Sequence, residues 1–178
     1  MIKAFISYTI VFWMFVSCAP STKQSIPPSQ IPTIKTTYNT SSASKIEREI
    51  LKAINAFRMR KGLPKLSSHE TLREAAETHS NYMMHKAQSK GNLLHINHDR
   101  FSQRSHKLRA SGVSGSIAEN VAVLQGIPES QAAERFVSQW INSKGHLKNI
   151  LSNHRASGIA VSFGSNNTIY ATQIFASP

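Results

Sequence analysis

Glu119 and Asn120 lie inside an otherwise apolar stretch, Ile117–Leu124. A short apolar run of this length is typical of a buried strand, and a carboxylate inside such a strand is unfavourable unless another group pairs with it. Histidines are available as partners, because His98 lies upstream of the run and His146 downstream. We therefore predict that His98, Glu119 and His146 meet in one polar cleft.

Two imidazoles and one carboxylate are compatible with two kinds of chemistry. They match a zinc site with three protein ligands and an open position, in which Glu119 serves as ligand or general base. They also match a metal-free network in which Glu119 accepts hydrogen bonds from the rings. We expect no cofactor to be required, with weak Zn²⁺ binding by His98, Glu119 and His146 as the alternative. Asn120 is expected either to orient a neighbour in this cleft or to have a structural role in the strand.

Other side chains with chemical potential are given less weight. His79 lies on the apolar face of a predicted helix and is expected to be a core histidine, and His95 is an alternative to His98. Ser143 precedes His146 by three residues, but a hydrolytic triad needs a base at hydrogen-bond distance, which this spacing alone does not provide. A group of cations beside the predicted cleft either attracts an anionic ligand or forms a solvated basic loop: Arg100, Arg104, Lys107 and Arg109.

Periodicity and turn residues predict the elements that must position these side chains. The first expected helix begins at Ser44, with Ser44 and Glu47 as a capping box, and ends at Gly62. A second is expected from Ser67 or Ser68 to about Gln88. A third is expected over 129–142, with Trp140 in the core, followed by one or two helical turns over 146–151. The expected strands are 117–124 and a hairpin of 158–163 and 168–175. Residues 93–116 show no clean period and are predicted to be irregular. This order predicts an antiparallel sheet covered by helices, an α+β fold.

The N-terminus has the features of an export signal. Lys3 precedes an apolar segment, 4–16, that is too short to span a bilayer comfortably. The single cysteine, Cys18, ends Phe15-Val-Ser-Cys18, which resembles the processing box of bacterial lipoproteins, although Phe15 stands where leucine is preferred. We predict a lipoprotein-like signal peptide over 1–18 with Cys18 lipidated, or else an ordinary secretory signal.

Composition and charge bound the remaining possibilities. The 178 residues are 40% hydrophobic and carry a net charge of +12, which fits one basic domain that favours anionic surroundings. Residues 19–43 are rich in Ser, Thr and Pro and are predicted to be a disordered tether, so the folded domain is 44–178. One cysteine excludes an intrachain disulfide. Nucleic acid is not expected as a partner, because of the export signal and because no aromatic-interleaved basic motif occurs. No feature of the sequence indicates an oligomeric state.

Six motifs in order resemble the CAP superfamily, or SCP domain, which includes cysteine-rich secretory proteins, antigen 5 and pathogenesis-related proteins, and specifically its bacterial branch. They are Asn55-Ala-Phe-Arg58 with Gly62-Leu-Pro-Lys-Leu66, Ala75-Ala-Glu-Thr-His79, His98-Asp-Arg-Phe-Ser-Gln-Arg104, Ala118-Glu-Asn-Val121, Trp140-Ile-Asn-Ser-Lys-Gly-His146 with Asn149-Ile-Leu151, and Tyr170-Ala-Thr-Gln173. The resemblance implies a three-layer α-β-α sandwich with a mainly antiparallel sheet. It also implies a cleft of two histidines and two glutamates, here His98, Glu119 and His146; the second glutamate has no counterpart, since Asn142 and Ser143 stand there.

The sequence thus leads to three functional hypotheses. The first is a binding module of the bacterial cell envelope, tethered to the membrane by a lipid on Cys18 and engaging a lipid, sterol or anionic cell-surface polymer through the His/Glu cleft. The second is a metal-dependent hydrolase that acts on cell-wall or peptide substrates. The third is a structural interaction domain with a vestigial cleft. We expect the first, and a non-enzymatic role, because the missing second glutamate leaves fewer groups for acid–base chemistry.

Overall fold

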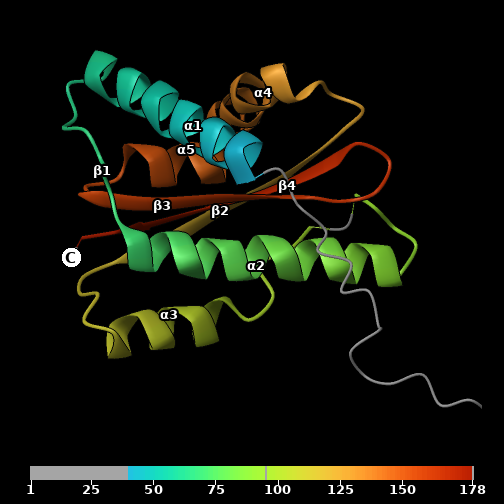
Figure 1. The fold of residues 1–178 in the computed structure, drawn as a ribbon. Helices are drawn as coiled ribbons and strands as arrows, with labels where there is room; N and C mark the ends of the chain where they lie inside the picture. The colour runs from blue at the N-terminus through green and yellow to red at the C-terminus, as the bar shows by residue number, and fades with distance from the viewer. Residues whose placement is uncertain (1–39, 95, 178) are drawn as a thin grey trace, which may run out of the picture. The chain divides into compact units, whose positions relative to one another are not determined.

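The computed structural model describes residues 40–94 and 96–177, which form nine helices and strands (Figure 1). In chain order they are α1 (Thr40–Arg60), β1 (Ser67–Ser68), α2 (Glu70–Ser89), α3 (Phe101–Ala110), β2 (Ile117–Gln125), α4 (Glu129–Asn142), α5 (Lys144–Leu151), β3 (Ala156–Phe163) and β4 (Thr168–Ala176). Helix α4 has the bounds expected from its periodicity. No helix among these residues is both long enough and apolar enough to cross a membrane.

The four strands form one sheet in the order β1-β3-β4-β2. Strands β3 and β4 make the expected antiparallel hairpin, and its turn places Asn166 and Asn167 at φ values of 53° and 51°. Asparagine tolerates this left-handed conformation better than most residues, so the turn fits its sequence. Strand β2 pairs antiparallel with β4 and forms one edge of the sheet, while the short β1 pairs parallel with β3 at the other edge.

Helices cover both faces of this sheet (Figure 1). Helices α1, α4 and α5 pack on one face around a core that includes the fully buried Trp140 and Phe136. Helix α2 packs on the other face, and α3 lies against α2. The contact between α2 and β3 is so close that a Cβ on Gly158 would lie 2.0 Å from the backbone nitrogen of Arg73. The three-layer sandwich and the mainly antiparallel sheet are therefore confirmed.

The beginning of α1 differs from the prediction. The helix starts at Thr40, so Ser44 lies inside it and does not cap it, and residues 40–43 belong to the helix and not to the tether. Glu47 does not form the predicted capping box with Ser44. Its carboxylate instead accepts a hydrogen bond from the backbone N–H of Val161 at 3.1 Å. A tertiary bond to strand β3 has replaced the local one that the sequence pattern suggested.

Two further predictions about secondary structure were wrong. Ser67 and Ser68 do not start α2; they pair with Ala156 and Ser157 as a short parallel strand, and the helix begins at Glu70. The segment 93–116 is not irregular throughout, because it contains α3. Only Leu108 of this polar helix is fully buried, so it shows no apolar stripe that periodicity could detect.

Several predictions concern residues outside the described part of the chain. These are the signal peptide over 1–18, the lipidation of Cys18, the tether up to residue 39, and His95 as an alternative to His98. They stay predictions.

Candidate functional site

The edge strand β2 presents Glu119 and Asn120 to opposite faces of the sheet. Neighbouring residues of a strand point to opposite sides, and here Glu119 faces α2 and α3 while Asn120 faces α5. Because β2 is the last strand of the sheet in the described part of the chain, groups from both helical layers can meet across its free edge. The residues predicted from the sequence to share one site therefore lie at the edge of the sheet.

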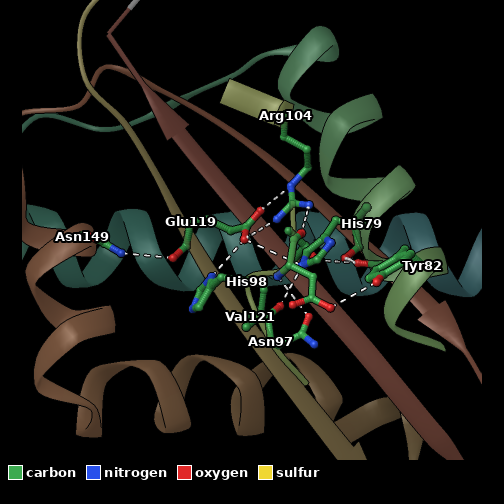
Figure 2. Close-up of polar contacts among 12 residues, drawn as sticks. His79, Tyr82, Asn97, His98, Arg104, Glu119, Val121 and Asn149 are labelled. Atoms are coloured by element: carbon green, nitrogen blue, oxygen red, sulfur yellow. Dashed lines mark hydrogen bonds and ion pairs between the residues drawn. The ribbon is translucent and has the colours of Figure 1, made fainter. Parts of the chain in front are cut away.

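Glu119 lies at the centre of a network of charged groups (Figure 2). Arg104 from α3 binds it in a bidentate manner, with Nε donating to Oε2 at 2.8 Å and an Nη donating to Oε1 at 2.7 Å. The ring Nδ1–H of His98 donates to the same Oε1 at 2.9 Å. Burial alone would raise the pKa of Glu119, whose side chain is 1% exposed, but the hydrogen bonds from His98 and Arg104 hold that pKa below its ordinary value. Glu119 is therefore an ionised carboxylate.

His98 and His146 come from opposite sides of the strand and approach each other. Their ring centroids lie 6.4 Å apart with the ring planes tilted by 55°. The His98 side chain, which follows the loop after α2, is 50% exposed. Partial burial, and then the charge of His98, lower the pKa of His146, which favours a neutral ring on α5. The structure thus brings His98, Glu119 and His146 to one place, with His98 as the link between the other two.

Asn120 orders the α5 side of the strand and does not face the carboxylate. It is fully buried, accepts a hydrogen bond from Asn149 Nδ2 at 2.9 Å and donates one to the backbone oxygen of His146 at 3.3 Å. Asn149 also donates to the backbone oxygen of Glu119, and Trp140 Nε1 donates to that of Val121 (3.2 and 3.3 Å). These side chains occupy outward carbonyl groups of β2, which protects an edge strand from pairing with another chain.

His79 is buried in the core and also lies next to the network around Glu119. Its Nε2–H donates to the backbone oxygen of Asn97 at 2.9 Å and lies 3.7 Å from Oε1 of Glu119 (Figure 2). Burial is the main cause that lowers the pKa of His79, so the ring is favoured in its neutral form, stacked on Tyr82 at a centroid distance of 5.9 Å. Its Nδ1 is buried without a hydrogen-bond partner among the described residues. The expectation of a core histidine did not include this contact with Glu119.

Comparison with known proteins agrees with the fold and the motif order. The model of the CAP family, the cysteine-rich secretory protein family, matches residues 51–175. The chain belongs to the CAP family.

This CAP domain is also similar to a curated relative and to solved structures. It is 30% identical to the uncharacterised protein YkwD of Bacillus subtilis over 160 residues. This aligned stretch covers 86% of this chain and 56% of the relative. The chain thus spans little more than half of that relative's length.

Solved structures support the fold alone, because their identities to this chain are low. An extracellular SCP-domain protein of Bacillus anthracis matches with a TM-score of 0.56 at 22% identity, and the match covers 87% of this chain and 45% of that protein's chain. A cysteine-rich secretory protein of Staphylococcus aureus matches with a TM-score of 0.55 at 18% identity, and the match covers 76% of this chain and 39% of that protein's chain. An outer surface protein of Borrelia burgdorferi matches with a TM-score of 0.55 at 20% identity, and the match covers 75% of this chain and 92% of that protein's chain.

The group of His98, Glu119 and His146 in this CAP domain does not fit a three-ligand zinc site. Both carboxylate oxygens of Glu119 accept hydrogen bonds from Arg104, and a guanidinium at that distance competes with a cation for the same lone pairs. Within residues 40–94 and 96–177, no three His, Cys, Asp or Glu side chains are grouped as metal ligands. Asn142, one of the two residues that stand where the resemblance implies a second glutamate, is exposed and hydrogen-bonds Ser138 at 3.4 Å. The predicted weak Zn²⁺ binding stays a prediction.

A serine hydrolase arrangement is also not formed. Ser143 precedes α5 as its N-terminal flanking residue, and in the described part of the chain no hydrogen bond joins its hydroxyl to the ring of His146. Arg104, the main partner of Glu119, was noted in the sequence only as one cation of a basic loop. Its proximity to His98 in the motif His98–Arg104 was the signal that could have identified it, since α3 carries it back toward β2.

Proposed function

We propose that this CAP domain is an exported binding module, which engages a lipid, a sterol or an anionic cell-surface polymer at the cleft of His98, Glu119 and His146. The observation that supports a binding role is the commitment of Glu119 to Arg104 and His98. A general base must offer a lone pair to a substrate proton, and a carboxylate with depressed pKa and three charge-assisted bonds is a weak base for that purpose. The metal-dependent hydrolase has correspondingly less support.

The groups that remain available in the cleft are two imidazole rings. His98 uses Nδ1 for Glu119, so its Nε2 is the atom that can contact a ligand, and half of its side chain is exposed. His146 adds a largely neutral ring at 6.4 Å. Two adjacent rings can hydrogen-bond a polar group and pack against an apolar one, which suits recognition without bond cleavage.

Charge favours the anionic polymer among the three ligand classes. The chain carries a net charge of +12. Helix α3, beside the cleft, has cationic side chains at Arg104, Lys107 and Arg109 and no acidic residue. Such a surface raises the local concentration of a polyanion and accelerates its association. A neutral sterol would gain nothing from this charge.

Export and tethering are part of the same proposal. The similar structures from Bacillus anthracis and Borrelia burgdorferi are named as an extracellular and an outer surface protein. Together with the apolar segment 4–16 and the single Cys18, these names support transport across the membrane and a lipid anchor on Cys18. Metabolic labelling with a fatty-acid analogue tests the anchor: the wild-type chain should be labelled and Cys18→Ser should not. Label on neither chain would overturn the anchor.

Binding is tested with the Cys18→Ser chain, so that an acyl chain cannot attach the protein to vesicles by itself. The chain is sedimented with isolated cell-wall polymer, with vesicles containing phosphatidylglycerol, and with sterol-containing vesicles. We expect the cell-wall polymer to bind most strongly. In that assay His98→Ala should weaken binding several-fold, whereas His106→Ala, an exposed histidine on α3, should not.

Two outcomes of this assay would contradict the proposal. Equal binding by wild type and His98→Ala would remove the cleft from the binding site. Complete loss of binding in 0.5 M salt, with no effect of His98→Ala, would assign the interaction to exposed charge, because screening at that ionic strength acts over about 5 Å.

A further inference from the structure

A groove lies between α2 and α3, and Arg104 and His79 are among the residues that line it. Its volume is about 320 Å³. Its lining residues come only from these helices and their ends, including Ala75, His79 and Tyr82 from α2 and Lys107 and Leu108 from α3. A cavity of this size is within the range that holds a small organic ligand.

The groove is cationic on one wall. Arg100, Arg104 and Lys107 line it, and Glu74 is the one acidic residue among those that do. Arg104 is already neutralised by Glu119. In the described part of the chain no carboxylate pairs with Arg100 or Lys107, which leaves two cations without a counter-ion at the groove.

The floor and one end of the groove are apolar and aromatic. Ala75 packs beside the buried Leu108 in the core on the α2 side of the sheet, and the Tyr82 ring, which stacks on the buried His79 ring, continues this surface. The guanidinium of Arg100 lies 4.9 Å from the centre of the Tyr82 ring, so a cation is held at the end of the aromatic surface. Arg100 adopts φ = 61°, a conformation that is unfavourable for a residue with a side chain and that tends to occur at functional sites.

We propose that the groove between α2 and α3 binds a small organic anion, with its carboxylate or phosphate group on Arg100 and Lys107 and its apolar body on Ala75, Leu108 and the ring of Tyr82. This site is separate from the cleft of His98 and His146. It requires neither the cleft's ligand nor the N-terminal anchor, so it stands or falls independently of the proposed function.

The experiment uses three probes with the same two-ring apolar body, 2-naphthoate, 2-naphthyl phosphate and the uncharged 2-naphthol, titrated into the protein at pH 7 and followed by their fluorescence. We expect both anions to bind and 2-naphthol to bind much more weakly. The stronger of the two anions identifies the head group. Replacing both cations, Arg100→Gln with Lys107→Gln, should weaken anion binding by about tenfold, since each exposed charge contact contributes below about 1 kcal/mol.

Matched variants locate the site. Arg109→Gln makes the same charge change on α3 two residues from Lys107 but outside the groove, and it should leave binding within about twofold. Ala75→Trp fills the groove and should abolish binding; its melting temperature shows whether it is folded. His98→Ala, in the cleft, should have no effect.

The proposal is overturned by any of three results: no binding of either anion at millimolar concentration, equal binding of 2-naphthol, or an Arg109→Gln loss as large as that of the double variant. Retained binding in a folded Ala75→Trp protein would also place the anion elsewhere.

Discussion

Among the described residues of this CAP domain, two charged side chains, Arg58 and Glu119, are buried, and they are stabilised by different means. Arg58 of α1 is fully buried, and no carboxylate of the described residues contacts it; its guanidinium donates to the backbone oxygens of Pro64, Ile150, Ser152 and His154, at distances from 2.6 to 3.0 Å. Glu119 is instead surrounded by side chains.

The difference separates a charge with a structural role from the charge at the proposed binding site. Backbone carbonyl groups cannot titrate or change partner, so Arg58 joins α1 to the end of α5 and to the segment before β3 without offering any chemistry. The partners of Glu119 are Arg104, His98 and, at 3.7 Å, His79, all of which can change charge, rotate or contact a ligand. A buried charge with a shifted pKa and titratable neighbours is a candidate for a functional site.

Removing the charge of Arg58 should have the largest effect on stability. Arg58→Met leaves the carbonyl groups of Ile150, Ser152 and His154 without their donor, and we expect the free energy of unfolding to fall by about 3–5 kcal/mol. Urea denaturation measures this loss. Arg58→Lys should recover little of it, since an ammonium group cannot reproduce the planar fork. The control is Arg60→Met on the exposed side of the same helix; a comparable loss there would contradict the structural role of Arg58.

Neutralising the carboxylate should have a smaller effect. Glu119→Gln removes the counter-charge of Arg104, and we expect a loss of about 2–3 kcal/mol by urea denaturation, less than for Arg58→Met because Arg104 is 10% and His98 50% exposed to water. The double variant Glu119→Gln with Arg104→Met should be less destabilised than the two single losses added together. Strict additivity of the two losses would show that the two residues are not coupled.

Acid should destabilise the domain in two stages. Burial is the main cause that lowers the pKa of His79, His146 and His154, so the unfolded chain takes up their protons first and stability falls as the pH drops below about 6.5. The pKa of Glu119 is also lowered, and its contribution is lost only as the pH falls below about 4.3.

Urea denaturation of the wild type and Glu119→Gln between pH 8 and pH 3 measures both stages. Each proton contributes at most about 1.4 kcal/mol per pH unit. Glu119→Gln should keep the decline near pH 6 and lose part of the one below pH 4.3. A variant that loses the upper stage instead would show that the histidines depend on the charge of Glu119.

The two charges also show what the sequence could and could not predict. A glutamate in an apolar run requires a partner, and this argument led to His98 and His146. Arg104 was not recognised as the main partner because α3 has no apolar periodicity, and without that helix the side chain could not be directed toward β2. Three of the four bonds of Arg58 join positions 92 to 96 residues apart, and all four end on backbone oxygens, which no side-chain pattern records. Elements with strong local patterns, such as α4 and the β3–β4 hairpin, were predicted almost to the residue.

The smallest expected effect concerns the residue that leads from the cleft loop into α3. Arg100 has φ = 61°, which costs a non-glycine residue about 1 kcal/mol, whereas its contact with Tyr82 returns about 0.5 kcal/mol. Arg100→Gly should therefore raise the free energy of unfolding by up to about 0.5 kcal/mol while it weakens anion binding in the α2–α3 groove. Asn166→Gly, in the hairpin turn, is the control and should gain less, because asparagine already tolerates φ = 53°. If Arg100→Gly were less stable than the wild type, the contact of Arg100 with Tyr82 would stabilise the fold by more than the backbone strain costs. The strain at residue 100 would then be explained without a ligand.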